Sequence, residues 1–364
     1  MSLLKNIFKK KNEPIKTNEE FWSWFQKNEK TFFSVVKEKG DIEKGFFDKL
    51  SPKLGELKDG FFYLTGMLND NTCELVLTAD GAIKNIAFVE DLVKSAPKID
   101  GWVFTALKPP MDIKNVSIRM ARYEYKAENL SFYANEDAAY PDEIDVTIVY
   151  DDFNEADKGN ITIGVYIFLD NFLGELNFAT TIDNIKVVDK KSAEKELVPI
   201  EKLKAFLIWR EKEFIEKYDD VKWDAENDGY SMLEAQLESG NALLAAINMS
   251  LLGWHGKASH PWILNIEINY DGKSNNGMPD DETYALLNQI EDEIMEELKD
   301  FEGYLNIGRQ TAESVREIYL ACMDFRKPTK VLYQIKQKYA GKIELNYDIY
   351  KDKYWKSFDR FVRE

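Results

Sequence analysis

Cysteine and histidine are scarce in this chain. Its 364 residues include two cysteines and two histidines. Cys73 and Cys322 each lie in an apolar run typical of a buried strand, with no second cysteine or histidine at metal-ligand spacing. This pattern argues against a disulfide framework and a structural zinc site. It favours a reducing compartment, so we expect a cytoplasmic protein.

Long apolar runs are also missing. None reaches the roughly 18 residues that a membrane-spanning helix needs, so we expect no membrane span. The opening "MSLLKNIFKKKNEP" is basic but has no apolar core followed by a small-residue cleavage site. We therefore interpret residues 1–17 as a flexible basic tail and not as a secretory signal.

Catalytic and phosphate-binding motifs are missing as well. The sequence has no Gly-x-Ser-x-Gly elbow, no Walker loop and no Gly-x-Gly-x-x-Gly after a strand. We predict no catalytic residues, no cofactor and no metal site, and we favour a protein without enzymatic activity. An enzyme or small-ligand binder with its site between two domains stays open as an alternative.

Acidic residues outnumber basic ones. Sixty-five Asp and Glu against 48 Lys and Arg give a formal charge of −17. Such a chain repels polyphosphate, and no local cluster of basic and aromatic residues reverses this, so direct nucleic-acid binding is not expected. The acidic surface serves either solubility alone or the binding of a basic protein.

The length favours two domains, since a domain usually has roughly 100–200 residues. The acidic stretch "DDVKWDAENDG" is typical of a linker. We therefore predict an α+β protein with an N-terminal domain at 18–218, a linker at 219–229 and a C-terminal domain at 230–364.

The N-terminal domain is expected to contain a mixed sheet behind leading helices. A helix starts at Asn18 and stops at Gly40, and a second helix and a hairpin of strands follow. The run at 157–173 is apolar throughout, so periodicity fits a buried helix and a strand equally. We take it as a helix, followed by a strand over 177–188.

The C-terminal domain shows a clearer alternation of patterns. Its predicted core order is strand, helix, strand, strand, helix, strand, preceded by a hairpin and followed by a short helix. These core elements are expected at 261–270, 280–299, 303–310, 314–323, 328–340 and 342–350. This is the ferredoxin-like βαββαβ order, with two helices on one face of an antiparallel sheet.

Three segments of this domain carry a family resemblance. They are "HPWILNIEINYDGKSNNGMPDDETYALLNQIEDEIMEEL", "GYLNIGRQTAESVREIYLACMD" and "YDIYKDKYWKSFDRF". Residues 226–364 resemble a bacterial family, domain of unknown function 695. That family is similar in fold to the regulator of RNase E activity B, which inhibits an endoribonuclease by binding it. The first 215 residues resemble an uncharacterised module often attached to such domains.

The loop "DGKSNNGMPDDE" has the length of a calcium-binding EF-hand loop and begins with Asp271 and ends with Glu282. However, Lys273 occupies the third position, where an oxygen ligand belongs, and Gly277 stands at position seven instead of six. A strand and not a helix precedes the loop. We therefore interpret it as a strand-to-helix connection.

The helix after this loop carries the candidate site. Tyr284, Leu287, Ile290, Ile294 and Leu298 form its apolar stripe at helical spacing. Four acids fall away from that stripe: Glu293, Glu296, Glu297 and Asp300. They form either a solvated face or the docking surface for a basic protein partner.

Both histidines, His255 and His260, lie in the turn "GWHGKASHPW". No cysteine or carboxylate at ligand spacing accompanies them, so we interpret them as surface-loop residues. The functional hypothesis is thus a protein-binding regulator or inhibitor that acts through an acidic surface. A structural homo-oligomer is the remaining alternative.

Overall fold

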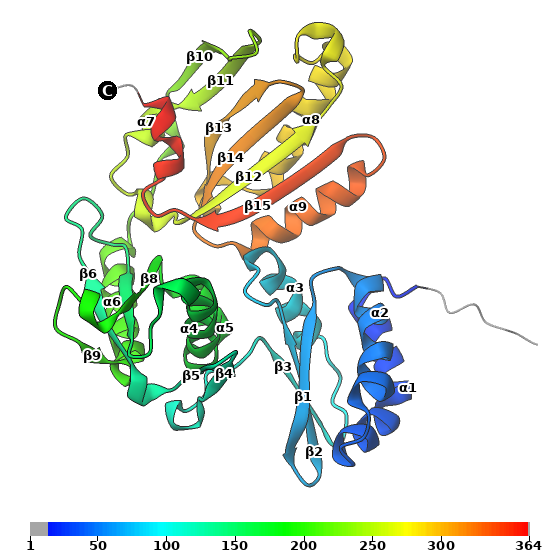
Figure 1. Cartoon of the computed structure of the whole chain (residues 1–364). Helices are drawn as coiled ribbons and strands as arrows, with labels where there is room; N and C mark the ends of the chain where they lie inside the picture. The colour runs from blue at the N-terminus through cyan, green and yellow to red at the C-terminus, as the bar shows by residue number, and fades with distance from the viewer. Residues whose placement is uncertain (1–13, 363–364) are drawn as a thin grey trace, which may run out of the picture. The chain divides into compact units, whose positions relative to one another are not determined.

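The computed structural model describes residues 14–362 (Figure 1). The chain forms two compact units, one ending at Pro109 and one running from Pro110 to Glu364. Both combine helices and sheets, which confirms the expected mixed α+β class. The predicted linker at 219–229 lies within the second unit, and a domain boundary there stays a prediction. Most of the predicted basic tail, residues 1–17, lies outside the described residues.

The first unit packs helices against a three-stranded sheet of order β1-β2-β3. Strands β1 and β2 form the expected antiparallel hairpin, and β3 runs parallel to β2. Helix α1 starts with a capping box, in which Thr17 and Glu20 each bond to the other's backbone N–H. The elements are α1 (Asn18–Lys37), a π-helical turn (Glu43–Phe47), α2 (Asp48–Leu57), β1 (Phe62–Asn69), β2 (Thr72–Thr78), α3 (Ile83–Lys94) and β3 (Trp102–Ala106).

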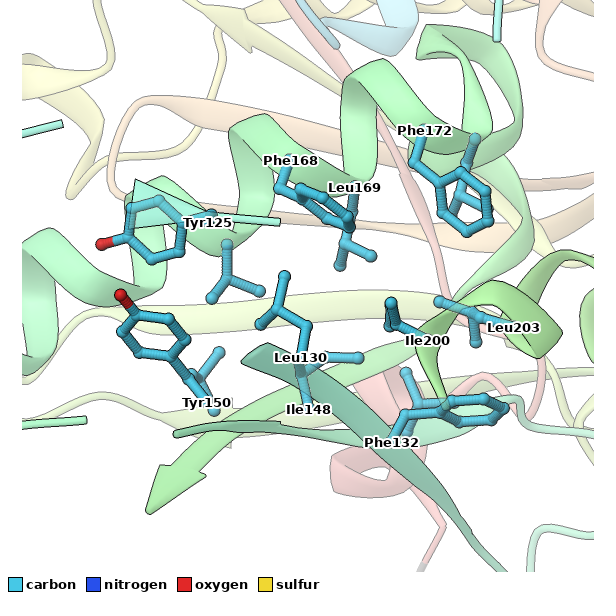
Figure 2. Packing of buried hydrophobic residues seen from close by; sticks show 14 of the residues in the cluster. Tyr125, Leu130, Phe132, Ile148, Tyr150, Phe168, Leu169, Phe172, Ile200 and Leu203 are labelled. Carbon is cyan, nitrogen blue, oxygen red and sulfur yellow. The ribbon is translucent and has the colours of Figure 1, made fainter. Parts of the chain in front are cut away.

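The second unit begins with a four-stranded sheet of order β8-β7-β6-β9 and a two-stranded one, β4-β5. Its elements are β4 (Ile118–Met120), β5 (Tyr123–Tyr125), β6 (Leu130–Asn135), β7 (Asp145–Tyr150), α4 (Lys158–Leu173), α5 (Glu175–Thr181), β8 (Asn184–Asp189), β9 (Val198–Pro199) and α6 (Leu203–Tyr218). Figure 2 shows how Phe168 and Leu169 of α4 face Leu130 and Ile148 of the sheet. The expected helix at 157–173 is therefore present.

The strand expected over 177–188 is wrong in its first half. Residues Glu175–Thr181 form α5, and the strand β8 starts only at Asn184. Gly174, with φ +83°, ends α4 and starts α5. A positive φ of this kind is accessible to glycine at little cost, and it permits a second short helix where periodicity favoured a strand.

The rest of the unit is a six-stranded antiparallel sheet of order β10-β11-β13-β14-β12-β15. Every predicted element of this region is present. The elements are β10 (Tyr230–Gln236), β11 (Ala242–Asn248), α7 (Met249–Leu252), β12 (Trp262–Asn269), α8 (Asp281–Glu297), β13 (Tyr304–Ala312), β14 (Val315–Cys322), α9 (Arg326–Tyr339), β15 (Glu344–Lys351) and a terminal 3₁₀-helix (Lys356–Phe361).

The two faces of this sheet are covered differently. Helices α8 and α9 lie together on one face (Figure 1). On the other face, Trp355, Phe358 and Phe361 from the chain's end pack onto strand residues that include Ile263 and Tyr319. The aromatic C-terminal segment therefore covers this face of the sheet. This arrangement places α8 and its acids at the outside of the unit.

Candidate partner-binding groove

Helix α8 forms as its sequence predicts. Asp280 caps it by accepting a hydrogen bond from the Thr283 N–H at 2.8 Å, and this bond lowers the pKa of Asp280. Asp281 and Glu282 follow in the first turn, where the helix dipole favours negative charge. Four residues of the apolar stripe are buried, whereas Tyr284 is 46% exposed.

The structure separates the four predicted acids into two kinds. Glu296, Glu297 and Asp300 are exposed, as expected for an outer face. Glu293 is different, because its side chain is only 24% exposed and faces α9. Asp300 lies beyond the helix, in the turn before β13. The structure therefore brings Glu293, Glu296 and Glu297 together and leaves Asp300 apart.

Glu293 is held by three donors. It accepts hydrogen bonds from Lys338 Nζ at 2.8 Å, Tyr339 OH at 2.8 Å and Gln289 Nε2 at 3.2 Å. The bond from Lys338 is the largest influence that lowers the pKa of Glu293. Glu293 thus joins α8 to α9 and is only partly exposed, unlike Glu296 and Glu297.

A groove of about 350 Å³ lies between α8 and α9. The acids Glu293, Glu296 and Glu297 line it from α8, and Val331, Gln334, Ile335 and Lys338 line it from α9. Three carboxylates against one ammonium group leave an excess of two negative charges. The groove therefore offers an acidic wall and a partly apolar floor.

Sequence reasoning did not find the α9 side of this groove. Val331 and Ile335 are four residues apart on α9 and both are buried, so helical periodicity could have identified them. It also did not find Phe301, which follows Asp300 and is 82% exposed. An exposed aromatic ring is a common anchor for a protein partner.

A cavity of about 330 Å³ lies elsewhere in the second unit, between α5, α6 and the start of α9. Lys351 and Lys353 of the chain's end line it. Burial lowers the pKa of Lys351 to about 8. Its ammonium group, however, donates to Asp183 Oδ1 and to the carbonyls of Thr180 and Thr181, which uses all three of its N–H bonds.

The loop at Asp271–Glu282 connects β12 to α8. The Gly277 carbonyl accepts from the Ser314 N–H and from Tyr270 OH, each at 2.8 Å, so it faces the β13–β14 turn. Within residues 14–362, no group of three or more His, Cys, Asp or Glu side chains could hold a metal ion.

The two histidines have different environments. His255 is exposed, as expected, but His260 is 2% exposed, so its assignment to the surface is wrong. Its ring lies edge-on to Trp254, at 5.5 Å between centroids, and Nδ1 lies 2.8 Å from Ser259 Oγ. The aromatic packing of the chain's end against this turn explains the burial.

Comparison with known proteins gives one match. Residues 234–362 match the model of DUF695, a family of unknown function. No curated protein and no solved structure matches the chain. The resemblance of the C-terminal part to this family is confirmed, whereas the resemblance of the first 215 residues to an attached module stays a prediction. Among the described helices, none combines the length and apolarity needed to cross a bilayer.

Proposed function

We propose that the chain is a non-catalytic protein-binding regulator and that the groove between α8 and α9 receives a basic segment of its partner. The observation that carries this proposal is the alignment of Glu293, Glu296 and Glu297 along one wall of the groove. Lys and Arg side chains of a partner would meet an excess of negative charge there. Complementary charge of this kind speeds encounter and selects the partner.

The groove also supplies apolar contact. Val331 and Ile335 form its floor. Phe301 lies outside the groove, beyond the end of α8, and is 82% exposed. An amphipathic segment with basic residues on one side and apolar residues on the other suits such a surface. Charge would set the partner's register, and the apolar contacts would supply the larger share of affinity.

We infer in addition that β12–β15 with α8 and α9 form a ferredoxin-like domain. The strand order β13-β14-β12-β15 and the position of both helices on one face support this. The sequence resemblance to the regulator of RNase E activity B is a fold-level analogy in the same direction. It suggests an inhibitor that binds a nuclease, in a bacterial cytoplasm.

A second candidate function is small-ligand binding in the cavity beside Lys351 and Lys353. Its volume is near the lower limit of typical ligand sites, roughly 300 Å³. The saturation of the Lys351 ammonium group by protein acceptors favours a structural role for that lysine, so we place this candidate second.

The test of the protein-binding proposal is a capture experiment at low and high salt. The bait is the purified full chain, and the lysate comes from the organism that carries the gene. We expect Glu296→Lys/Glu297→Lys to reduce recovery of a basic partner by about ten-fold or more. Because Glu296 and Glu297 are exposed, the variant should keep its fold, which circular dichroism checks.

The matched control is Glu194→Lys/Glu196→Lys. Both of these glutamates are exposed and lie outside the groove, and the total charge changes by the same amount. A partner that binds the wild type and the control but not the groove variant supports the proposal. Equal recovery by all three proteins, or no basic partner at low salt, contradicts it.

A further inference from the structure

A second groove lies on the other side of α8, where the hairpin β10–β11 extends the sheet beyond the helix. In-register pairs place Met232, Ala246 and Arg309 in one row across β10, β11 and β13. A parallel row contains Leu244, Thr311 and Arg316. Residues paired in register point to the same face, so both rows face the side of the sheet that carries α8.

The groove has a volume of about 270 Å³ and a mostly apolar wall. Met232 is 75% exposed, and Leu244 and Tyr284 are also exposed. Met278 and Pro279 of the loop before α8 close the remaining side. A contiguous apolar patch of this kind around a hollow is typical of a ligand-binding site.

Two arginines form the floor of this apolar hollow. Arg316 is only 2% exposed and lies under the Tyr284 ring, at 5.2 Å from its centroid. Its Nε donates to Thr311 Oγ1 at 3.2 Å and its Nη1 donates to Asn288 Oδ1 at 2.8 Å.

One carboxylate serves both guanidinium groups. Arg309 Nη1 donates to both oxygens of Glu291 at 2.8 Å, and Arg316 Nη1 lies 3.8 Å from Glu291 Oε2. The cluster therefore keeps one positive charge in excess. Burial lowers the pKa of Arg316, and the nearby charge of Arg309 adds to this shift.

Two guanidinium groups that share one carboxylate leave positive charge in excess around a buried side chain, which is costly, and an anion that entered the groove would offset it. Guanidinium groups suit carboxylates because their planar N–H donors match the two carboxylate oxygens. Glu234 lies at the outer end of the row that contains Leu244 and Arg316. A ligand with its anionic end toward Arg316 and its apolar end toward β10 would keep its charge away from Glu234.

We propose that this groove binds a small organic monocarboxylate with an apolar body. The carboxylate pairs with Arg309 and Arg316, and the apolar body covers Met232, Leu244 and Met278. This site is separate from the groove between α8 and α9. The proposed small-molecule site would act in addition to the protein-binding groove, and the contacts that support the small-molecule site do not depend on the protein-binding function.

The test is a titration of the full chain, labelled with ¹³C at the methionine methyl groups, and followed by NMR. Octanoate is the probe, and 1-octanol and octylamine are the neutral and cationic analogues. We expect saturable shifts at Met232 and Met278 with octanoate, and little change at Met249, which packs on the other face of the sheet. Octanol should bind at least about ten-fold more weakly because it lacks the charge-assisted hydrogen bonds.

Two variants separate recognition from folding. Arg309→Gln removes one guanidinium group, and Met232→Glu adds a negative charge at an exposed position of the groove. Both should weaken octanoate binding by about ten-fold or more. Arg360→Gln is the matched control, because Arg360 contacts Tyr319 on the opposite face.

Equal binding of octanoate and octanol, unchanged binding in Met232→Glu, or an absence of saturable shifts overturns the proposal. Shifts at Met232 that depend on protein concentration and not on octanoate would also overturn it, because they would identify a second copy of the chain as the occupant of the groove.

Discussion

His260 shows how a single buried side chain links this fold to pH. Its ring packs edge-on against Trp254, and Trp355 Nε1 donates to the His260 carbonyl at 2.9 Å. Ser259 Oγ donates to the Gly256 carbonyl, so the Nδ1 of His260 carries the proton that reaches Ser259. The Nδ1–H of the neutral ring therefore has an acceptor, and a second proton would place a charge in a buried site.

We predict that His260 makes the protein sensitive to acid. Burial lowers the pKa of His260 from 6.5 to about 4, so the unfolded chain binds this proton more readily than the folded one. The contribution of neutral His260 to the free energy of unfolding is therefore fully present above pH 6.5, and it is lost as the pH falls toward 4. The full shift corresponds to about 3 kcal/mol.

Urea unfolding at pH 6.5 and pH 4 measures this effect. His260→Asn keeps a donor near Ser259 without the titration, and it should lose less stability than the wild type over that interval. His255→Asn is the control, because His255 is exposed and should behave like the wild type. An identical decline in the wild type and His260→Asn would contradict the prediction.

At the scale of elements, the connection between β12 and α8 depends on Gly277. Its φ is +82°, and a Cβ there would lie 2.8 Å from the Glu313 backbone. Gly341, in the turn after α9, has a similar φ of +80° but nothing within 4 Å of its Cβ position. A comparison of substitutions at these two glycines therefore separates the cost of backbone strain from the cost of a steric collision.

We predict that Gly277→Ala destabilises the protein more than Gly341→Ala. Gly341→Ala should cost about 1 kcal/mol, from the positive φ alone. Gly277→Ala should cost about 2–3 kcal/mol, because the β13–β14 turn must also move. Denaturant unfolding measures both changes, and equal losses would show that the contact with Glu313 is dispensable.

Periodicity predicted the elements of the C-terminal region well because they are long and strongly patterned. The order from β12 to β15, the cap at Asp280 and the burial of the stripe through Leu287 all follow from local sequence. The local sequence pattern did not predict the orientation or burial of side chains that depend on residues far away in the sequence. Glu293 faces α9 because Lys338 and Tyr339 are there, and Arg316 is buried in a strand because Glu291 and Asn288 approach it.

The helix α5 was missed for a different reason. Its residues are compatible with helix and with strand, and one glycine conformation at Gly174 changes the outcome. The candidate site was therefore half predictable. Helical spacing can indicate both the acidic wall on α8 and the pair Val331 and Ile335 on α9, whereas their meeting in one groove required the two helices to be placed side by side.

At the scale of the second unit, buried charges connect segments far apart in the chain. Asp183 Oδ2 accepts from Lys353 Nζ at 2.7 Å, and Lys353 also donates to the Asp142 carbonyl. Asp142 accepts in turn from Lys217, Tyr218 and Tyr354. Burial raises the pKa of Asp142, but these hydrogen bonds outweigh it and leave the pKa below its ordinary value.

This network joins Lys217 and Tyr218, just before the stretch at 219–229, to Lys353 and Tyr354, near the end of the region that matches DUF695. Lys353 is 5% exposed, so its removal would leave buried acceptors without their donor. We predict that Lys353→Met destabilises the second unit by about 3–5 kcal/mol. The matched control is Lys190→Met, because Lys190 forms an exposed pair with Asp151 and should cost no more than about 1 kcal/mol.

Limited proteolysis shows where the loss of Lys353 acts. If the network holds the two segments together, Lys353→Met should accelerate cleavage within 219–229, while Lys190→Met should cleave at the rate of the wild type. Exposed segments with few tertiary contacts are cleaved first, so a local increase there reports loosening of this connection. Faster cleavage throughout the chain would instead indicate global unfolding, and an unchanged rate would show that the hydrophobic cores alone maintain the unit.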